Sequence, residues 1–117
     1  KGELTHMSVE FKVVNSSLIV NINSEIDHHF VDETKKLIDK KASESGVKNI
    51  VFNFENVDFM DSAGIGMIIG RYKFTTQKGG ITSVACLSEN LKRIMMISGL
   101  YRIIKIYNSV EEASKAV

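Results

Sequence analysis

The stretch Val47-Lys48-Asn49-Ile50-Val51-Phe52-Asn53-Phe54 decides the fold of this chain. It is rich in β-branched and aromatic residues, which is typical of a central parallel strand that is buried on both faces. The following segment, Val57-Asp58-Phe59-Met60-Asp61-Ser62-Ala63-Gly64-Ile65-Gly66, leads from this strand into a helix that begins at Ser62. We expect the helix to run to about Gln77 and to stop at Gly79-Gly80. A strand followed by a helix in this way indicates an α/β sheet.

The segments before this unit predict a hairpin and a helix. Alternating apolar runs at 9–14 and 18–22 are separated by the turn-forming residues Asn15-Ser16-Ser17. Helical spacing of apolar residues follows Asp27, and Gly46 marks the expected end of that helix. The chain therefore opens with an antiparallel pair of strands and continues with a helix.

The segments after Gly79-Gly80 repeat the alternation of strands and helices. The expected elements are a strand over 81–86, a helix from a Ser88 cap through Met96 that stops at Gly99, a strand over 102–107, and a last helix with a capping box of Ser109 and Glu112. The whole pattern predicts one α/β domain with a mixed sheet, in which right-handed crossovers join parallel strands and the opening hairpin supplies an antiparallel edge.

Composition limits the classes of partner. The chain has 117 residues, of which 15 are basic and 14 acidic, and the resulting net charge of +1 is spread along the sequence. No large basic face is indicated, so we expect no direct nucleic-acid partner. The longest apolar runs fall far short of the ~18 residues of a membrane span. We therefore expect a soluble, cytoplasmic protein that does not bind membranes.

Two local features concern the cysteine and the start of the chain. Cys86 is the only cysteine and lies in an apolar run, so we expect a buried structural thiol in a reducing compartment. The polar residues 1–6 precede Met7 and resemble the remnant of an expression tag, which would make 7–117 the native domain.

The helix that begins at Ser62 has two different faces on a helical wheel. At about 100° per residue, an apolar stripe lies between about 240° and 340° from Ser62 and is the expected core face, formed by Ile65, Ile68, Ile69 and Tyr72. The opposite side holds Ser62, Ala63, Gly66, Met67, Gly70 and Lys73. Two glycines within a helix require an explanation, because each lowers the stability of the helix by roughly 1 kcal/mol relative to alanine. Either Gly66 and Gly70 pack closely against another element of the domain, or a partner's backbone lies along them with Met67 as an adaptable contact.

Ser62 itself admits more than one interpretation. A phosphate there would lie at the positive end of the helix dipole, where we expect unpaired N–H groups to serve as donors, and it would block docking by its charge and size. The simpler alternative is a polar residue in the first turn beside an Asp61 N-cap. A nucleophile elbow is excluded because Met60 stands where its glycine is needed, and a dinucleotide fingerprint fails at Ile69 for the same reason.

The triplet Asp27-His28-His29 is a second candidate site. No further cluster of Asp and His completes a coordination sphere, so we expect no metal and interpret Asp27 as a helix cap. Because loops at one edge of an α/β sheet gather together, this loop could still lie beside Ser62.

On these residues the chain resembles a known family from Met7 nearly to its end. Asp27-His28-His29, the segment Phe59–Gly66, Ile69–Lys73, Gly79-Gly80 and Ile97–Leu100 are similar to the anti-sigma factor antagonists, which are STAS domains, and most of all to the branch that controls the sporulation sigma factor F. The family often has a second Ser or Thr where this chain has Ala63, which leaves Ser62 without a rival acceptor.

The resemblance implies a binding protein rather than an enzyme, with no cofactor of its own. Its expected partners are an anti-sigma factor that is also a serine kinase, carrying ATP or ADP, and a serine phosphatase. Binding to the kinase would release the sigma factor, phosphorylation of Ser62 would inactivate the antagonist, and the phosphatase would restore it. The expected docking residues are Asp27, His28, Asp61, Ser62, Ala63, Gly64, Gly66, Met67 and Gly70. The rival hypothesis is a small phosphate-handling enzyme or nucleotide sensor that uses Ser62, Asp61 and His28.

Overall fold

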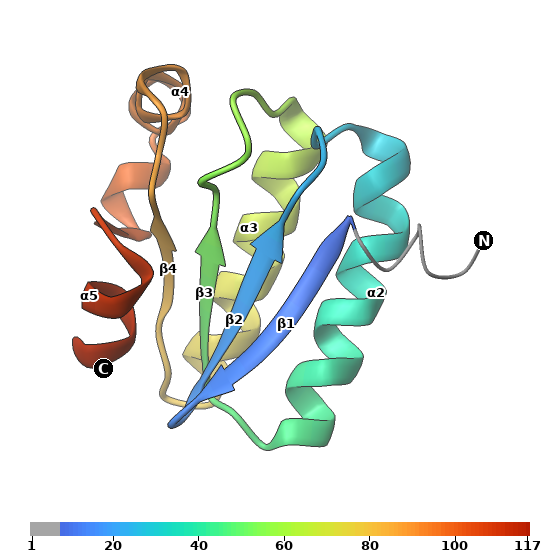
Figure 1. The fold of residues 1–117 in the computed structure, drawn as a ribbon, viewed down its shortest axis with the longest axis vertical. Helices are drawn as coiled ribbons and strands as arrows, with labels where there is room; N and C mark the ends of the chain where they lie inside the picture. Colours follow the sequence, from blue (N-terminus) through green and yellow to red (C-terminus); the bar gives the residue numbers. More distant parts are fainter. Residues whose placement is uncertain (1–7) are drawn as a thin grey trace.

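Five strands form one mixed sheet in the computed structural model, which describes residues 8–117 (Figure 1). The strands are β1 (Val9–Val14), β2 (Ser17–Ile22), β3 (Asn49–Asn53), β4 (Thr82–Ala85) and β5 (Lys105–Tyr107). The helices are α2 (His28–Ser45), α3 (Ser62–Gln77), α4 (Glu89–Ser98) and α5 (Val110–Lys115), and the 3₁₀ turn η1 (Leu100–Arg102) precedes β5. The predicted α/β class is confirmed.

The strands lie side by side in sequence order. β1 pairs antiparallel with β2, and β2, β3, β4 and β5 pair parallel. Val14 faces Ser17 across the hairpin, and the turn between them uses Asn15 at φ 55°, a left-handed conformation that asparagine tolerates. Parallel neighbours require a crossover, and α2, α3 and α4 supply one after each of β2, β3 and β4.

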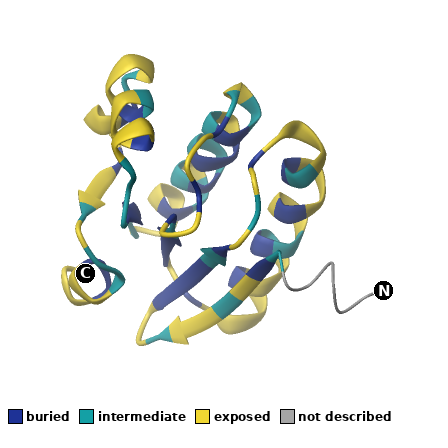
Figure 2. Ribbon diagram, turned by 45° about the horizontal axis from the view of Figure 1, so that its top comes forward, coloured by how far each residue is buried: buried dark blue, intermediate teal, exposed yellow. Residues whose placement is uncertain are grey.

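Both faces of the central strands are buried, as the sequence predicts. Helices α2 and α3 cover one face and α5 covers the other (Figure 1). Successive residues of β2 divide between two core clusters: Leu18 and Val20 belong to the larger one under α2 and α3, and Ile19 to the smaller one under α5. Figure 2 shows the buried residues along the middle strands and the exposed residues on the outer turns of the helices.

The predicted helix ends are confirmed at three helices. The carboxylate of Asp27 accepts a 2.9 Å hydrogen bond at the start of α2, and the hydroxyl of Ser88 accepts one of 3.1 Å at the start of α4. Gly46 and Gly99 end these helices at φ 68° and 80°, where a side chain would be strained. Helix α3 covers the predicted range and is followed by Lys78 as its C-cap.

The last part of the chain differs from the sequence prediction in two details. The strand expected over 102–107 begins only at Lys105, because the chain first makes the 3₁₀ turn η1, which buries Leu100 beneath α4. Ser109 caps α5 as predicted, whereas Glu112 accepts its hydrogen bond from the N–H of Asn108 rather than from that of Ser109.

The prediction that Cys86 is a buried core residue is wrong. The side chain is half-buried, because Cys86 lies just beyond β4 where the backbone turns with φ 63°. Partial burial, with the negative charge of Glu55 as the second cause, raises the pKa of the Cys86 thiol above its usual value.

The expectation of a tag remnant at residues 1–6 falls outside the described residues. Within residues 8–117, no helix is both long enough and apolar enough to cross a lipid bilayer.

Candidate partner-binding site

Asp61 fixes the start of α3. Its carboxylate accepts hydrogen bonds from the N–H groups of Ala63 (2.9 Å) and Gly64 (3.3 Å), and its backbone has the extended conformation of an N-cap. The carbonyl of Asp61 accepts the N–H of Ile65 at 3.2 Å, which closes the first turn. Ser62 is therefore the first residue of the helix, and it is exposed to solvent.

This cap corrects the expected surroundings of a phosphate on Ser62. The N–H groups of Ala63 and Gly64 are not free donors, because the carboxylate of Asp61 already binds them. A phosphate on Ser62 would extend into solvent beside that carboxylate, near the positive end of the α3 dipole. It would alter the charge of the surface while the capped helix stays as it is.

The core face of α3 is only partly the one that the helical wheel indicated, because Ile68 is buried whereas Ile65, Ile69 and Tyr72 are partly buried against the core. The buried residues are Gly64, Met67, Ile68, Arg71 and Thr75, so the face is turned toward the polar positions of the helix. Arg71 is buried because its guanidinium forms an ion pair with Asp39 of α2, with 3.1 Å between Nε and Oδ1. Thr75 is buried because its hydroxyl bonds that of Thr82 in β4 at 2.7 Å. These polar partners, which periodicity cannot reveal, bury residues that appear solvated in the sequence.

Two of the predicted docking residues therefore do not lie on the surface. Met67 is only 2% exposed and packs in the core. Gly64 is buried, and a Cβ atom there would lie 2.9 Å from both Ile26 Cγ2 and Met60 Cβ, so this glycine allows close packing within the domain. Met67 and Gly64 belong to the fold rather than to a docking surface.

The glycine strip on the outer face of α3 is confirmed in its position. Ser62 and Gly66 are exposed and Gly70 is half-buried. A Cβ atom at Gly66 or Gly70 would meet nothing within 4 Å, so close packing inside the domain does not explain these two glycines. The strip Ser62–Gly66–Gly70 is open to a partner.

The Asp27 loop lies beside the start of α3, as the sequence suggested. Ile26 and Met60 form an isolated parallel bridge, which joins the loop before α2 to the loop before α3. Asp27 and His28 are both exposed on this edge, and the ring of His28 stacks on that of His29 at 5.7 Å. Asp27, His28, Asp61 and Ser62 therefore share one end of the sheet.

An apolar groove that the sequence analysis did not identify adjoins Ser62. It is lined by Phe59, Met60, Asp61, Ser62, Ile65, Ile94, Ile97 and Ser98, with a volume of about 330 Å³. Ile97 is 80% exposed and Phe59 is 55% exposed. The signal was present in Ile94–Ile97, because a run of four apolar residues exceeds what one buried helix face can hold.

Comparison with known proteins places this geometry in a family. The sequence profile of the STAS domain matches residues 8–113. The chain belongs to the STAS domain family. It is 35% identical to an anti-sigma F factor antagonist from Paenibacillus polymyxa, over 89% of each chain. This STAS domain therefore falls among the anti-sigma factor antagonists, which are regulatory proteins.

Solved structures support the same assignment for the STAS fold. A candidate anti-sigma factor antagonist from Thermotoga maritima, whose crystal structure is known, is 26% identical in sequence to this chain. The two structures superpose with a TM-score of 0.88 over 97% of this chain and 96% of that one. The Bacillus cell fate determinant SpoIIAA in its phosphorylated form is 27% identical, with a TM-score of 0.72 over 92% of this chain and 97% of that one. The single STAS domain with its opening antiparallel pair is confirmed.

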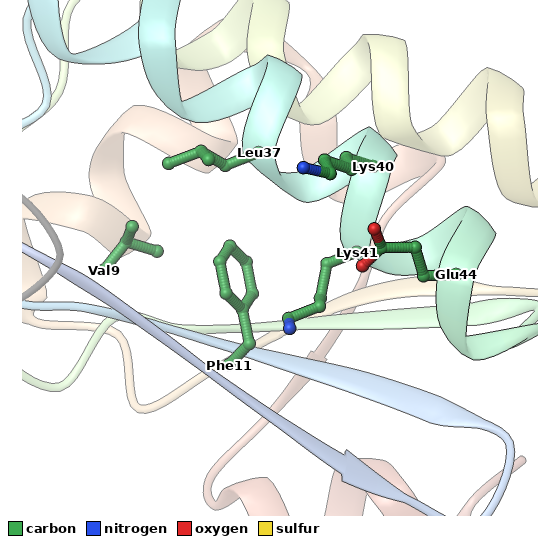
Figure 3. Close-up of a pocket in the computed structure, with 6 residues that line it drawn as sticks. All are labelled: Val9, Phe11, Leu37, Lys40, Lys41 and Glu44. Atoms are coloured by element: carbon green, nitrogen blue, oxygen red, sulfur yellow. The ribbon is translucent and has the colours of Figure 1, made fainter.

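Another pocket of this STAS domain lies away from Ser62. It opens between β1 and α2, where Val9, Phe11 and Leu37 form an apolar floor beside charged residues of α2 (Figure 3). None of its lining residues is Ser62, Asp61 or His28. Among residues 8–117, no group of three or more His, Cys, Asp or Glu side chains is placed to hold a metal ion.

Proposed function

We propose that this anti-sigma factor antagonist is switched by phosphorylation of Ser62. In the unmodified state it binds an anti-sigma factor that is a serine kinase, and this binding releases the sporulation sigma factor. The kinase, with its bound ATP, transfers phosphate to Ser62, and a serine phosphatase removes it. The docking surface comprises Asp27, His28, Asp61, Ser62, Ala63, Gly66 and Gly70, together with the groove of Phe59 and Ile97.

The observation that carries this proposal is the position of Ser62 among three exposed features. The Asp27 loop lies on one side of Ser62. The glycine strip continues from Ser62 along α3, and the apolar groove includes Ser62 in its lining. A phosphate would bring roughly −1.5 to −2 charges to the border of an apolar contact. A partner that covers the groove would have to desolvate that charge, so phosphorylation weakens docking without unfolding the domain. The phosphorylated form of the relative SpoIIAA supports a phosphate-bearing state in this family.

Phosphorylation by a purified anti-sigma factor kinase with Mg²⁺ and ATP, followed by mass spectrometry, tests the site. We expect one phosphate on the intact chain and none on Ser62→Ala. Ser98→Ala is the matched control, because Ser98 is an exposed serine that lines the same groove. Phosphate that persists on Ser62→Ala, or that disappears from Ser98→Ala, would contradict the assignment.

The rival function, an enzyme or nucleotide sensor built on Ser62, Asp61 and His28, finds little support in the geometry. The carboxylate of Asp61 is engaged as a helix cap, and the ring of His28 stacks on His29. The groove beside Ser62 is lined by Asp61 but not by His28. Nucleotide binding or turnover by the isolated chain that is lost in His28→Ala would favour the rival.

A further inference from the structure

A second apolar surface lies where α4 is followed by η1 and β5. It is a hollow of about 440 Å³ that shares no lining residue with the groove beside Ser62. Met96 is 58% exposed there, and Tyr101, Ile103 and Ile106 are each 41% exposed. Ile104, which is 2% exposed, anchors the segment to the core. The two surfaces flank the same helix, since Met96 belongs to one and Ile97 to the other.

Apolar exposure of this extent calls for an explanation. Single apolar residues on a surface are normal, as Val13 of β1 illustrates, but a contiguous patch marks a site of interaction. Here Met96, Tyr101, Ile103 and Ile106 lie together in one hollow. Figure 2 shows that α4 keeps exposed residues on its outward turns. The surface is thus available to a partner.

The two charged residues that line this hollow are both positive. Arg102 and Lys105 line it, and no acidic residue does. Neither residue takes part in the ion pairs formed within residues 8–117. The guanidinium of Arg102 instead lies over the Tyr101 ring, 5.7 Å from its centroid. The hollow therefore presents apolar side chains and uncompensated positive charge.

The charge pattern selects one class of occupant. A second copy of the chain in a symmetric contact would bring Arg102 and Lys105 against their own equivalents, which is repulsive. A lipid surface is recognised by clusters of about 4–8 basic residues and by protruding apolar side chains, whereas this site is concave and has only two cations. A protein segment with acidic and apolar side chains matches both properties.

We propose that the hollow of Met96, Tyr101, Ile103 and Ile106, with Arg102 and Lys105, binds an acidic, apolar segment of a protein partner. The segment binds in an extended form, because β5 is the last strand of the sheet and, among residues 8–117, pairs with β4 alone, which leaves its outer edge available for main-chain hydrogen bonds. Binding here leaves the Ser62 surface uncovered. The antagonist can then be held by one partner while Ser62 is phosphorylated or dephosphorylated by others.

The experiment uses the full chain and a fluorescein-labelled peptide in which glutamate alternates with leucine. We expect binding by fluorescence anisotropy and changes in the amide NMR signals of Met96 and of residues 101–106. Reversal of both charges, Arg102→Glu with Lys105→Glu, weakens binding about tenfold or more. The matched control is Lys35→Glu with Lys36→Glu on exposed positions of α2, which makes the same change in net charge and leaves the affinity unaltered. Ser62→Asp also binds the peptide normally, because its site is separate.

Several outcomes would overturn the proposal. One is equal binding of a peptide with lysine in place of glutamate, and another is a set of NMR changes outside the hollow. A third such outcome is the absence of binding at an acidic peptide concentration of about 1 mM, since a Kd of that size corresponds to a binding free energy of only about 4 kcal/mol. Binding to phosphatidylglycerol vesicles without binding to the peptide would assign the surface to membranes instead. If the charge-reversed variant unfolds, Ile103→Ser is tested in its place with the same expected loss.

Discussion

Ser62 and Ile97 line the same groove, although one begins α3 and the other lies near the end of α4. This arrangement arises from the parallel order of the sheet, because the loop after β3 and the helix after β4 meet at the same sheet edge. A partner that reaches the Ser62 hydroxyl therefore also meets the Ile97 side chain. In the function proposed above, partner binding and access to Ser62 are therefore coupled through one surface.

The first prediction concerns Ile97. Because Ile97 is 80% exposed, Ile97→Ser removes apolar contact area without disturbing the core. We expect binding to the anti-sigma factor kinase to weaken by about 1–2 kcal/mol, the size typical of an interface residue near the centre of a contact. Isothermal titration calorimetry measures the effect. Val13→Ser, which trims a 48% exposed residue on β1, is the control and should bind normally.

The second prediction concerns charge at Ser62. Ser62→Asp places a carboxylate at an exposed first helical position, where the helix dipole accepts negative charge. We expect the midpoint of thermal unfolding of the free protein to change little, and kinase binding to fall by about 1.4 kcal/mol or more, which is tenfold in affinity. Calorimetry of folding and of binding on the same samples separates the two effects. A large loss of stability would argue against a local change of surface.

The third prediction concerns Cys86. Since partial burial and the charge of Glu55 raise the pKa of its thiol, the reactive thiolate is scarcer than for a free cysteine at the same pH. Alkylation by iodoacetamide at mildly alkaline pH should be slower in the folded protein than after unfolding in urea. The sign of the linkage follows: the folded state holds the proton more tightly, so this group's contribution to stability is present below the ordinary thiol pKa and is lost as pH rises from there through the raised pKa of the folded state. Equal alkylation rates in the two states would contradict the raised pKa.

The sequence predicted the fold well where single residues have strong local effects. Asp27, Ser88 and Gly99 marked helix ends that the structure confirms, because caps and left-handed glycines act within a few residues. The buried face of α3 was predicted only in part, because it also depends on contacts between distant elements. Arg71 is buried by Asp39 and Thr75 by Thr82, and no apolar periodicity encodes such pairs.

In the candidate site, too, the features set by local sequence were predicted and those set by side-chain contacts between distant elements were not. Ser62 and its Asp61 cap were predicted from local sequence, and the nearness of the Asp27 loop from the general rule for loops at one edge of a sheet. The groove was not predicted, because Phe59 and Ile97 come together only when α4 is placed against the start of α3. Apolar residues are assigned to a core by default, and only the folded arrangement reveals those that the core leaves exposed.

The last prediction compares two glycines of α3 that are two positions apart. Gly64→Ala adds a Cβ atom 2.9 Å from Ile26 Cγ2 and Met60 Cβ, so neighbours must shift, and we expect a loss of about 1–3 kcal/mol in the free energy of unfolding. Gly66→Ala adds a Cβ atom with nothing within 4 Å and improves helix propensity, so we expect a gain of up to about 1 kcal/mol. Urea denaturation of both variants measures the difference. The more stable Gly66→Ala protein should nevertheless bind the kinase more weakly, because its added methyl group stands on the strip that we propose as part of the docking surface. Unchanged binding would show that the contact does not extend along α3 beyond Ser62.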